Sequence, residues 1–307
     1  MLVTLNSCEI GLGGICMRLA VLSGKGGTGK TTVAVNLALC WAPHRKTIYV
    51  DYDVEEPNGF IFLRPQIRGT STVSLPYPKI NGACTLCGKC SEACQYHALA
   101  VVGGQVLVFP ELCHGCGTCG IVCPVGAVEE VTRSLGQIDE GERDSLQCLQ
   151  GVLKEGESLA GPVIRELRRH EKGHTSQVEE VIVADCPPGS SCSVIHSAEG
   201  SDLALLVTEP TLFGLHDLKI AVRLMQELGL NFGVIQNKDD GGPLIREYCT
   251  QEGITLLGSI PFDLEIAKIY SRGQSLIHEP KWANLFKTLG ERIVTEVKQR
   301  KIGGEIA

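Results

Sequence analysis

The sequence predicts an α/β fold: a parallel sheet covered by helices on both faces, with a small cysteine-rich α+β module inserted into the chain. Three observations support this prediction. Strand-sized apolar segments alternate with segments of helical periodicity, which is typical of a parallel sheet covered on both sides. A glycine-rich stretch, SGKGGTGKTT, follows the first strand, and two cysteine runs of identical spacing interrupt the alternation further along.

The composition fits a globular chain of 307 residues, which is long enough for one large domain and a small module. The formal net charge of −7 argues against broad affinity for a phosphate backbone, so we expect no nucleic-acid partner. The longest apolar runs, such as residues 203–207, are too short to cross a bilayer, and no basic segment followed by an apolar run marks a signal peptide. We therefore expect a cytoplasmic protein without stable membrane insertion.

The first strand and the first helix frame a phosphate-binding loop. RLAVL at 18–22 reads as a buried strand and TTVAVNLALCWA at 31–42 as a helix, and the residues between them match the P-loop pattern G-x4-G-K-T. In such a loop, backbone N–H groups bind phosphates, the lysine contacts the β- and γ-phosphates, and the threonine hydroxyl ligates Mg²⁺. The predicted nucleotide-binding residues are Gly24, Gly26, Gly27, Thr28, Gly29, Lys30, Thr31 and Thr32, with Thr31 also a Mg²⁺ ligand.

The next distinctive feature is a pair of cysteine runs, CTLCGKCSEACQ at 84–95 and CHGCGTCGIVCP at 113–124. Each contains C-x2-C-x2-C-x3-C, the spacing of two-cluster ferredoxins, in which the fourth cysteine of each run ligates the other cluster. The first predicted [4Fe-4S] cluster is ligated by Cys84, Cys87, Cys90 and Cys123, and the second by Cys113, Cys116, Cys119 and Cys94.

A pair of zinc sites is the alternative for these eight cysteines. Zinc prefers well-separated C-x2-C pairs, so a third cysteine at the next step of both runs favours a cluster. Pro124 follows the second run as in the ferredoxin pattern, whereas Gln95 follows the first, a departure that affects a turn and no ligand. Residues 101–110 are predicted to form a hairpin between the runs. Because so small a module has little apolar surface, we expect cluster ligation to supply much of its stability.

A second lysine, Lys25, stands at the start of the glycine-rich loop, and KGGTGKTT resembles the deviant P-loop of the MinD/ParA/Mrp/nitrogenase iron-protein family of ATPases. The resemblance continues downstream. The stretches similar to the family's switch I, switch II and later nucleotide-side segments are TIYVDYDVEEPN at 47–58, VIVADCPPG at 181–189, FGVIQNK at 232–238 and GSIPFD at 258–263.

This resemblance implies roles for individual residues. Asp51 and Asp185 would lie near Mg²⁺, and Asp53 would position or activate the attacking water. Gly189 would lie near the γ-phosphate, and Asn237 matches the family's adenine-contacting asparagine. The resemblance therefore predicts four catalytic residues, which are Lys25, Lys30, Asp53 and Asp185.

The resemblance also implies that Lys25 crosses a nucleotide sandwich to the phosphates of a partner subunit, as an arginine finger does in other NTPases. We therefore expect a dimer in the ATP state, either a homodimer or a heterodimer with a related ATPase.

The cysteine module falls between the segments that resemble switch I and switch II. We expect a discontinuous ATPase domain of residues 17–75 and 132–300, an inserted two-[4Fe-4S] ferredoxin-like domain of residues 76–131, and an extension over residues 1–16. The whole chain resembles the MinD-superfamily ATPases with an inserted ferredoxin domain. The acidic segment 138–157 is predicted to be a hairpin or loop returning from the module.

Two further features have alternative interpretations. Cys192 lies seven residues after Asp185, the offset at which the nitrogenase iron protein has the cysteine of a bridging cluster. A bridging cluster needs a second ligand in each subunit, and the sequence identifies none; Cys148 is only a guess. A buried structural cysteine is the alternative for both Cys192 and Cys148. The final helix, residues 282–300, carries an apolar stripe that packing against the sheet explains more simply than the membrane targeting used by MinD.

These features favour three functions. The first is an ATP-binding and ATP-hydrolysing protein in which nucleotide state gates electron transfer through two [4Fe-4S] clusters. The second is an iron–sulfur cluster carrier of the Mrp type, and the third is a MinD/ParA-like positioning ATPase whose ferredoxin module is structural. The expected cofactors are ATP or ADP, Mg²⁺ and two [4Fe-4S] clusters. Because some relatives occur with a small metal–sulfur protein, the orange protein, we expect a redox or iron–sulfur protein as partner.

Overall fold

The computed structural model describes residues 16–174 and 180–304, with side chains described to residue 301. Within these ranges the main feature is a nine-stranded sheet with the order β11-β10-β9-β1-β8-β2-β7-β6-β3. The strands from β11 to β7 are parallel to one another, whereas β6 runs antiparallel to both β7 and β3.

The strands of this sheet are β1 (Met17–Leu22), β2 (Lys46–Asp51), β3 (Gln66–Ile80), β6 (Val128–Arg143), β7 (Leu146–Leu153), β8 (Glu180–Asp185), β9 (Leu203–Thr208), β10 (Phe232–Asp239) and β11 (Leu256–Pro261). The helices are α1 (Lys30–Trp41), α2 (Gly59–Leu63), α3 (Lys89–Glu92), α4 (Thr118–Ile121), α5 (Ala160–His174), α6 (Cys192–Ala198), α7 (Leu212–Glu227), α8 (Leu244–Gln251), α9 (Leu264–Ser271) and α10 (Pro280–Gly304). Two 3-10 turns span Pro110–Leu112 and Leu276–His278.

Two hydrophobic cores lie on opposite faces of the parallel strands, because successive strand residues point to opposite sides. In β1, Leu19 and Val21 join the core under α1 and α10, whereas Ala20 and Leu22 join the core under α5, α6, α7 and α8. Central strands such as β1 and β8 are buried along their whole length. The predicted parallel sheet with helices on both faces is therefore confirmed.

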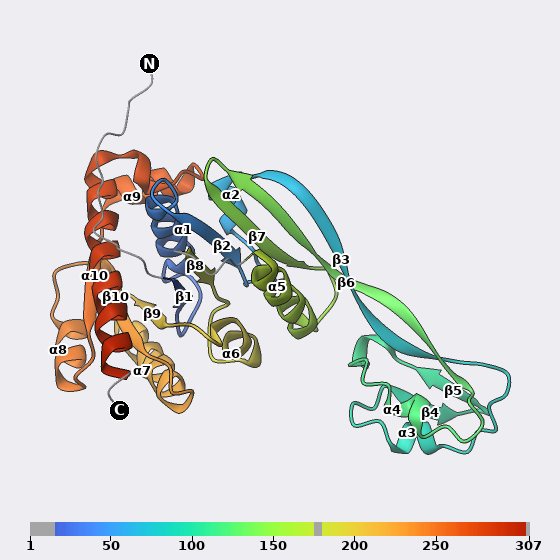
Figure 1. The fold of residues 1–307 in the computed structure, drawn as a ribbon. Helices are drawn as coiled ribbons and strands as arrows, with labels where there is room; N and C mark the ends of the chain where they lie inside the picture. The colour runs from blue at the N-terminus through green and yellow to red at the C-terminus, as the bar shows by residue number, and fades with distance from the viewer. Residues whose placement is uncertain (1–15, 175–179, 305–307) are drawn as a thin grey trace.

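A long two-stranded ribbon, formed by β3 and β6, leaves the edge of this sheet (Figure 1). Its register runs from Gln66 opposite Glu142 to Ile80 opposite Val128. Pro76 and Pro78 lie in β3, which is the edge strand and therefore tolerates residues without a backbone N–H. The sequence analysis did not predict this ribbon.

The cysteine module lies at the far end of the ribbon (Figure 1). It contains the short helices α3 and α4 and a hairpin of β4 (Leu99–Val102) and β5 (Gln105–Val108), so the predicted hairpin over 101–110 is present. The acidic segment 138–157 forms the end of β6, a tight turn and β7, which is a hairpin and adds a strand to the sheet beside β2.

The final helix, α10, packs against the sheet as the simpler interpretation predicts. Trp282, Phe286, Ile293 and Val297 are buried in the core that α1 shares. None of the helices in the described ranges combines the length and the apolar character needed to cross a bilayer. The predicted extension, residues 1–16, lies outside the described residues except for its last position.

Candidate functional site

The first candidate site is the loop between β1 and α1. Gly27 and Gly29 adopt the left-handed region, with φ of 77° and 95°, and α1 begins directly after Gly29. The backbone N–H groups at the start of a helix carry partial positive charge and bind phosphates. Lys30, the first residue of α1, is buried. The loop therefore has the backbone form that a phosphate-binding loop requires.

Two buried carboxylates face this loop from the ends of β2 and β8. Asp51 accepts hydrogen bonds from the backbone N–H groups of Gly59 at 2.9 Å and Asp53 at 3.1 Å. The Tyr49 hydroxyl donates to Asp185 Oδ2 at 3.0 Å and lies 3.5 Å from Asp51 Oδ2. Burial, followed by the charge of Asp185, raises the pKa of Asp51; burial also raises the pKa of Asp185, although the Thr31 hydroxyl and Lys30 oppose this.

This pair of carboxylates fits the Mg²⁺ that the predicted nucleotide would bring. Asp185 Oδ1 is buried and has no hydrogen-bond partner among the described residues. A divalent cation would reverse the penalty on two neighbouring ionised carboxylates, and carboxylate and hydroxyl oxygens are the ligands that Mg²⁺ prefers. The predicted ligand Asp51, however, has its oxygens engaged by backbone N–H groups, so Asp185 and Thr31 have the freer donor atoms.

Asp53 lies just beyond β2, beside the P-loop. Burial raises the pKa of Asp53 to about 6, with Lys30 acting to lower it and Asp185 to raise it. A carboxylate with such a pKa is suited to accept a proton near neutral pH. Asp53 also lines a cavity of about 720 Å³ whose other walls are the loop from β7 to α5 and the residues after Asp185.

Three side chains from neighbouring strands contact the P-loop. Asn237 Nδ2 donates to the Thr28 carbonyl at 2.7 Å, so in this structure Asn237 supports the loop. Lys25 Nζ lies 2.5 Å from Glu209 Oε1, and Lys238 Nζ donates to the Gly27 carbonyl at 3.0 Å. Sequence analysis assigned no role to Glu209 or to Lys238. Their place at the carboxyl ends of buried parallel strands, where ligands of open α/β sheets bind, was a signal that could have found them.

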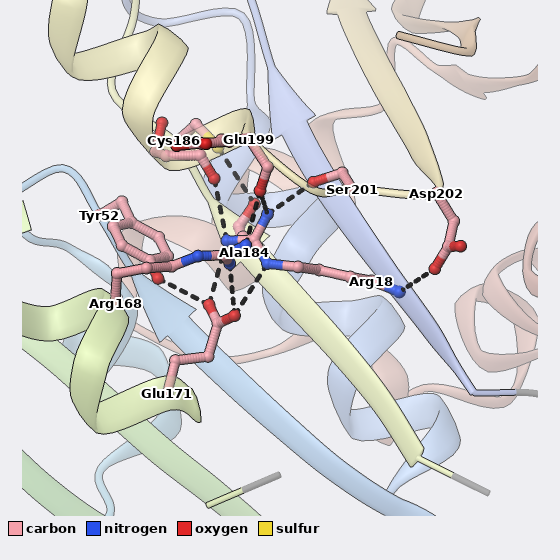
Figure 2. A network of polar contacts seen from close by, with 10 residues as sticks. Arg18, Tyr52, Arg168, Glu171, Ala184, Cys186, Glu199, Ser201 and Asp202 are labelled. Carbon is pink, nitrogen blue, oxygen red and sulfur yellow. Dashed lines mark hydrogen bonds and ion pairs between the residues drawn. The ribbon is translucent and has the colours of Figure 1, made fainter. Parts of the chain in front are cut away.

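Behind the switch segments lies a buried polar network (Figure 2). The Arg18 guanidinium binds the Glu171 carboxylate with two hydrogen bonds of 2.9 and 3.0 Å, and the Tyr52 hydroxyl donates to the same carboxylate at 2.6 Å. Arg18 also donates to the Ser197 carbonyl at 2.9 Å and to Ser201 Oγ at 2.6 Å. The network therefore connects β1, α5, α6 and Tyr52, the residue before Asp53. No local sequence pattern predicts it.

The second candidate site is the cysteine module, which has two cavities. Each is lined by four cysteines, three from one run and one from the other. The cavity nearer the parallel sheet, here called the proximal cavity, is lined by Cys94, Cys113, Cys116 and Cys119. The other, the distal cavity, is lined by Cys84, Cys87, Cys90 and Cys123. Among the described residues no three His, Cys, Asp or Glu side chains lie close enough together to hold a single metal ion.

The two halves of the module repeat with an offset of 29 residues. Backbone N–H groups of Ala98 and Ala127 donate to Cys94 Sγ at 3.3 Å and to Cys123 Sγ at 3.2 Å. Left-handed residues also repeat, as Leu86, Gly88 and His97 in one half and Gly115, Gly117 and Gly126 in the other. Two of these six are not glycine, and a left-handed conformation costs a residue with a Cβ roughly 1–2 kcal/mol. The loops thus hold a costly backbone form that directs thiols and N–H groups at each cavity, as cluster sites require.

The surroundings of the two cavities differ. Tyr96 and His114 stack at the proximal cavity, with ring centroids 3.7 Å apart, and Glu130 also lines it. The distal cavity has apolar neighbours, including Ile80 and Val125.

The two cysteines considered for a bridging cluster, Cys148 and Cys192, lie in different environments. Cys148 is buried in β7, and burial raises its pKa to about 12, in line with a structural cysteine. Cys192 is exposed at the start of α6, so the buried interpretation is wrong for this residue.

Comparison with known proteins places the chain among nucleotide-binding proteins. Residues 19–277 match the model of the CobQ/CobB/MinD/ParA nucleotide binding domain. An uncharacterized protein of Methanocaldococcus jannaschii is 30% identical over 83% of this chain and 88% of its own. The iron-sulfur cluster carrier protein of Pyrococcus abyssi is 24% identical over 92% of this chain and 88% of its own.

The fold is similar to that of the septum site-determining protein MinD of Pyrococcus horikoshii, solved with Mg-ADP. The TM-score is 0.56 at 20% identity, and the alignment covers 91% of this chain and 96% of MinD.

Proposed function

The chain belongs to the CobQ/CobB/MinD/ParA nucleotide-binding family, and from this premise we propose an ATP-hydrolysing protein whose nucleotide state gates electron transfer through two [4Fe-4S] clusters to a protein partner. The observation that carries the proposal is the ribbon. It joins a four-cysteine cavity to the edge of the sheet, where only β7 separates the ribbon strand β6 from β2. Strand β2 ends at the predicted switch residue Asp51, two residues before Asp53.

The nucleotide chemistry is assigned to residues of the first site. The glycine-rich loop and Lys30 bind the phosphates, and Asp185 and Thr31 would hold Mg²⁺, which would neutralise phosphate charge. Asp53, with its raised pKa, orients the attacking water and accepts its proton. Lys25 acts on the nucleotide of a partner subunit, so hydrolysis requires a dimer.

The clusters are assigned to the two cavities of the module. Cys94, Cys113, Cys116 and Cys119 hold the proximal cluster and Cys84, Cys87, Cys90 and Cys123 the distal one. When bound, the clusters would supply one-electron chemistry at low potential. The protein contributes the N–H donors to cysteine sulfurs and the apolar or polar surroundings, both of which tune cluster potentials.

A continuous packed path supports coupling between the two sites. Leu75 of the ribbon belongs to the same buried core as Val54 and Ala184, which flank the switch aspartates. At its other side Leu75 packs against Gly115, which lies in the chain between Cys113 and Cys116 of the proximal cavity. A Cβ on Gly115 would lie 2.9 Å from Leu75 Cδ1. A shift of the switch strands can therefore reach the proximal ligand loop without passing through solvent.

Helix α5 provides a second connection. Its Glu171 accepts a hydrogen bond from Tyr52, the neighbour of Asp53, and its His170 and His174 contact Glu140 of β6. One helical turn of α5 thus touches both the end of a switch strand and a ribbon strand.

The reduced cluster spectrum tests this proposal. We expect anaerobically purified protein to contain about eight irons and eight sulfides per chain. We expect its electron paramagnetic resonance spectrum to change between ADP and a non-hydrolysable ATP analogue. Stoichiometric zinc without sulfide would reject the clusters, and identical spectra in both nucleotides would reject the gating.

A cluster carrier of the Mrp type is the second candidate, favoured by the carrier protein of Pyrococcus abyssi among the relatives. The exposed Cys192, on the switch II side of the sheet, is the residue available for a transferable cluster. Transfer of a cluster to an apo-ferredoxin in the presence of ATP, lost in Cys192→Ser but kept when the module cysteines are replaced by serine, would establish this function.

A further inference from the structure

Glu209 follows β9 and lies beside the P-loop. Its two carboxylate oxygens bind two different lysines. Oε1 lies 2.5 Å from Lys25 Nζ and Oε2 lies 3.0 Å from Lys238 Nζ. Lys238 Nζ also donates to the Gly27 carbonyl within the P-loop at 3.0 Å. Three elements thus converge on the loop, and Lys25 is bound by its own chain.

The pair is charged and partly shielded from water. The Glu209 side chain is 15% exposed and that of Lys25 is 34% exposed. Burial acts to raise the pKa of Glu209, but the hydrogen bonds from Lys25 and Lys238 outweigh it and lower the pKa. Glu209 is therefore ionised at neutral pH, and a charge-assisted contact of this kind is stronger than a neutral hydrogen bond.

The placement of Glu209 is fixed from several sides. Lys238 adopts a left-handed backbone, with φ of 54°, next to Asn237, whose side chain holds the Thr28 carbonyl. Gly214 lies so close to the Glu209 carbonyl oxygen that a side chain there would clash. Glu209 is thus built into the rim of the loop, unlike a surface carboxylate that meets a lysine by chance.

We propose that Glu209 is a positioning residue that retains Lys25 within its own subunit and sets how readily this lysine is released to the partner's nucleotide. The inference rests on the proposed action of Lys25 across the dimer. The carboxylate and the partner's phosphates compete for one ammonium group. Lys238 holds the carboxylate and so keeps it from following Lys25.

Mixed dimers separate this role from a structural one. One chain carries Lys25→Ala and keeps Asp53; the other, the lysine donor, carries Asp53→Ala and keeps Lys25. Neither hydrolyses ATP as a homodimer, but in the mixed dimer the donor's Lys25 reaches the nucleotide of the chain with intact Asp53. Activity on mixing therefore tests the proposed function itself.

Glu209→Gln is then placed on one chain at a time. On the donor it should lower the concentration of donor needed for half-maximal activity by about three- to tenfold, the range for a partly exposed to charge-assisted pair. On the chain with Lys25→Ala it should change nothing, because that chain has no lysine to retain. Glu209→Asp on the donor should restore most of the wild-type behaviour, and Glu227→Gln, on the exposed end of α7, is the charge-matched control.

The outcomes are distinct. Absence of activity in every mixture would reject the action of Lys25 across the dimer. Activity on mixing with no effect of Glu209→Gln on the donor, with a loss, or with equal effects on both chains would overturn the role of Glu209. Thermal unfolding of each variant shows whether it is folded.

Discussion

Replacement of Gly115 by alanine tests the contact between the ribbon and the proximal cavity. Gly115 has φ of 67°, and a Cβ there would lie 2.9 Å from Leu75 Cδ1 and 3.0 Å from the Pro76 carbonyl oxygen. The left-handed backbone alone does not require glycine, because Leu86 occupies the equivalent position of the other half with φ of 58°. Glycine is required at position 115 because the backbone packs closely against Leu75 and Pro76 of the ribbon.

The loss of stability expected for Gly115→Ala has two parts, one from the backbone conformation and one from packing. The left-handed backbone costs an alanine about 1–2 kcal/mol, and forcing a methyl group against packed neighbours costs about 1–3 kcal/mol more. Gly126→Ala is the matched control, since Gly126 also has a positive φ, of 64°, but nothing within 4 Å of the added Cβ. The control should therefore lose only the stability that the left-handed backbone costs, about 1–2 kcal/mol.

Iron and sulfide analysis of anaerobically purified protein measures the outcome. Gly115→Ala should lose the proximal cluster and retain about four irons per chain, whereas Gly126→Ala should retain about eight. Gly115→Ala should cost less stability in a Leu75→Ala background than in the wild type, because one of the two clashes is then absent. Full iron content and equal unfolding temperatures for both glycine variants would refute the packing argument.

Three further predictions concern the nucleotide site and its support. Lys30→Ala should abolish ATP binding in calorimetry, whereas Asp53→Ala should bind ATP and lose hydrolysis; wild-type turnover by the latter would remove Asp53 from the mechanism. Because Asp53 must be ionised to accept a proton and its pKa is about 6, kcat/KM should fall about tenfold per pH unit below pH 6 and level off above it. A pH profile that is flat down to pH 5 would exclude this base. Glu171→Gln leaves the buried Arg18 without its charge partner and should cost about 3–5 kcal/mol in urea unfolding. Glu166→Gln, which affects the partly exposed pairs with Arg169 and His170 on the same helix, should cost less than about 1 kcal/mol.

The parallel sheet could be predicted from sequence because its strands are buried on both faces and therefore read as continuous apolar runs. The P-loop and the two cysteine sets could be predicted because each is defined by residues close together in the sequence. The ribbon was missed for the opposite reason: most of β3 is exposed, its polar residues follow no simple alternation, and its partner β6 lies beyond the whole module. The contacts of Lys25 with Glu209 and of Arg18 with Glu171 join residues more than 150 positions apart, and no local pattern encodes them.

The central claim is that nucleotide state changes the clusters through the ribbon, and a redox titration of the clusters tests it most directly. Midpoint potentials would be measured with ADP and with a non-hydrolysable ATP analogue, and again in Lys30→Ala, which cannot bind either. Coupling between two sites is typically about 1–3 kcal/mol, which corresponds to roughly 40–130 mV for a one-electron couple. We expect a shift of this size between the two nucleotides in the wild type, larger for the proximal cluster, and none in Lys30→Ala. If each cluster has the same midpoint potential with ADP as with the ATP analogue, the account is contradicted.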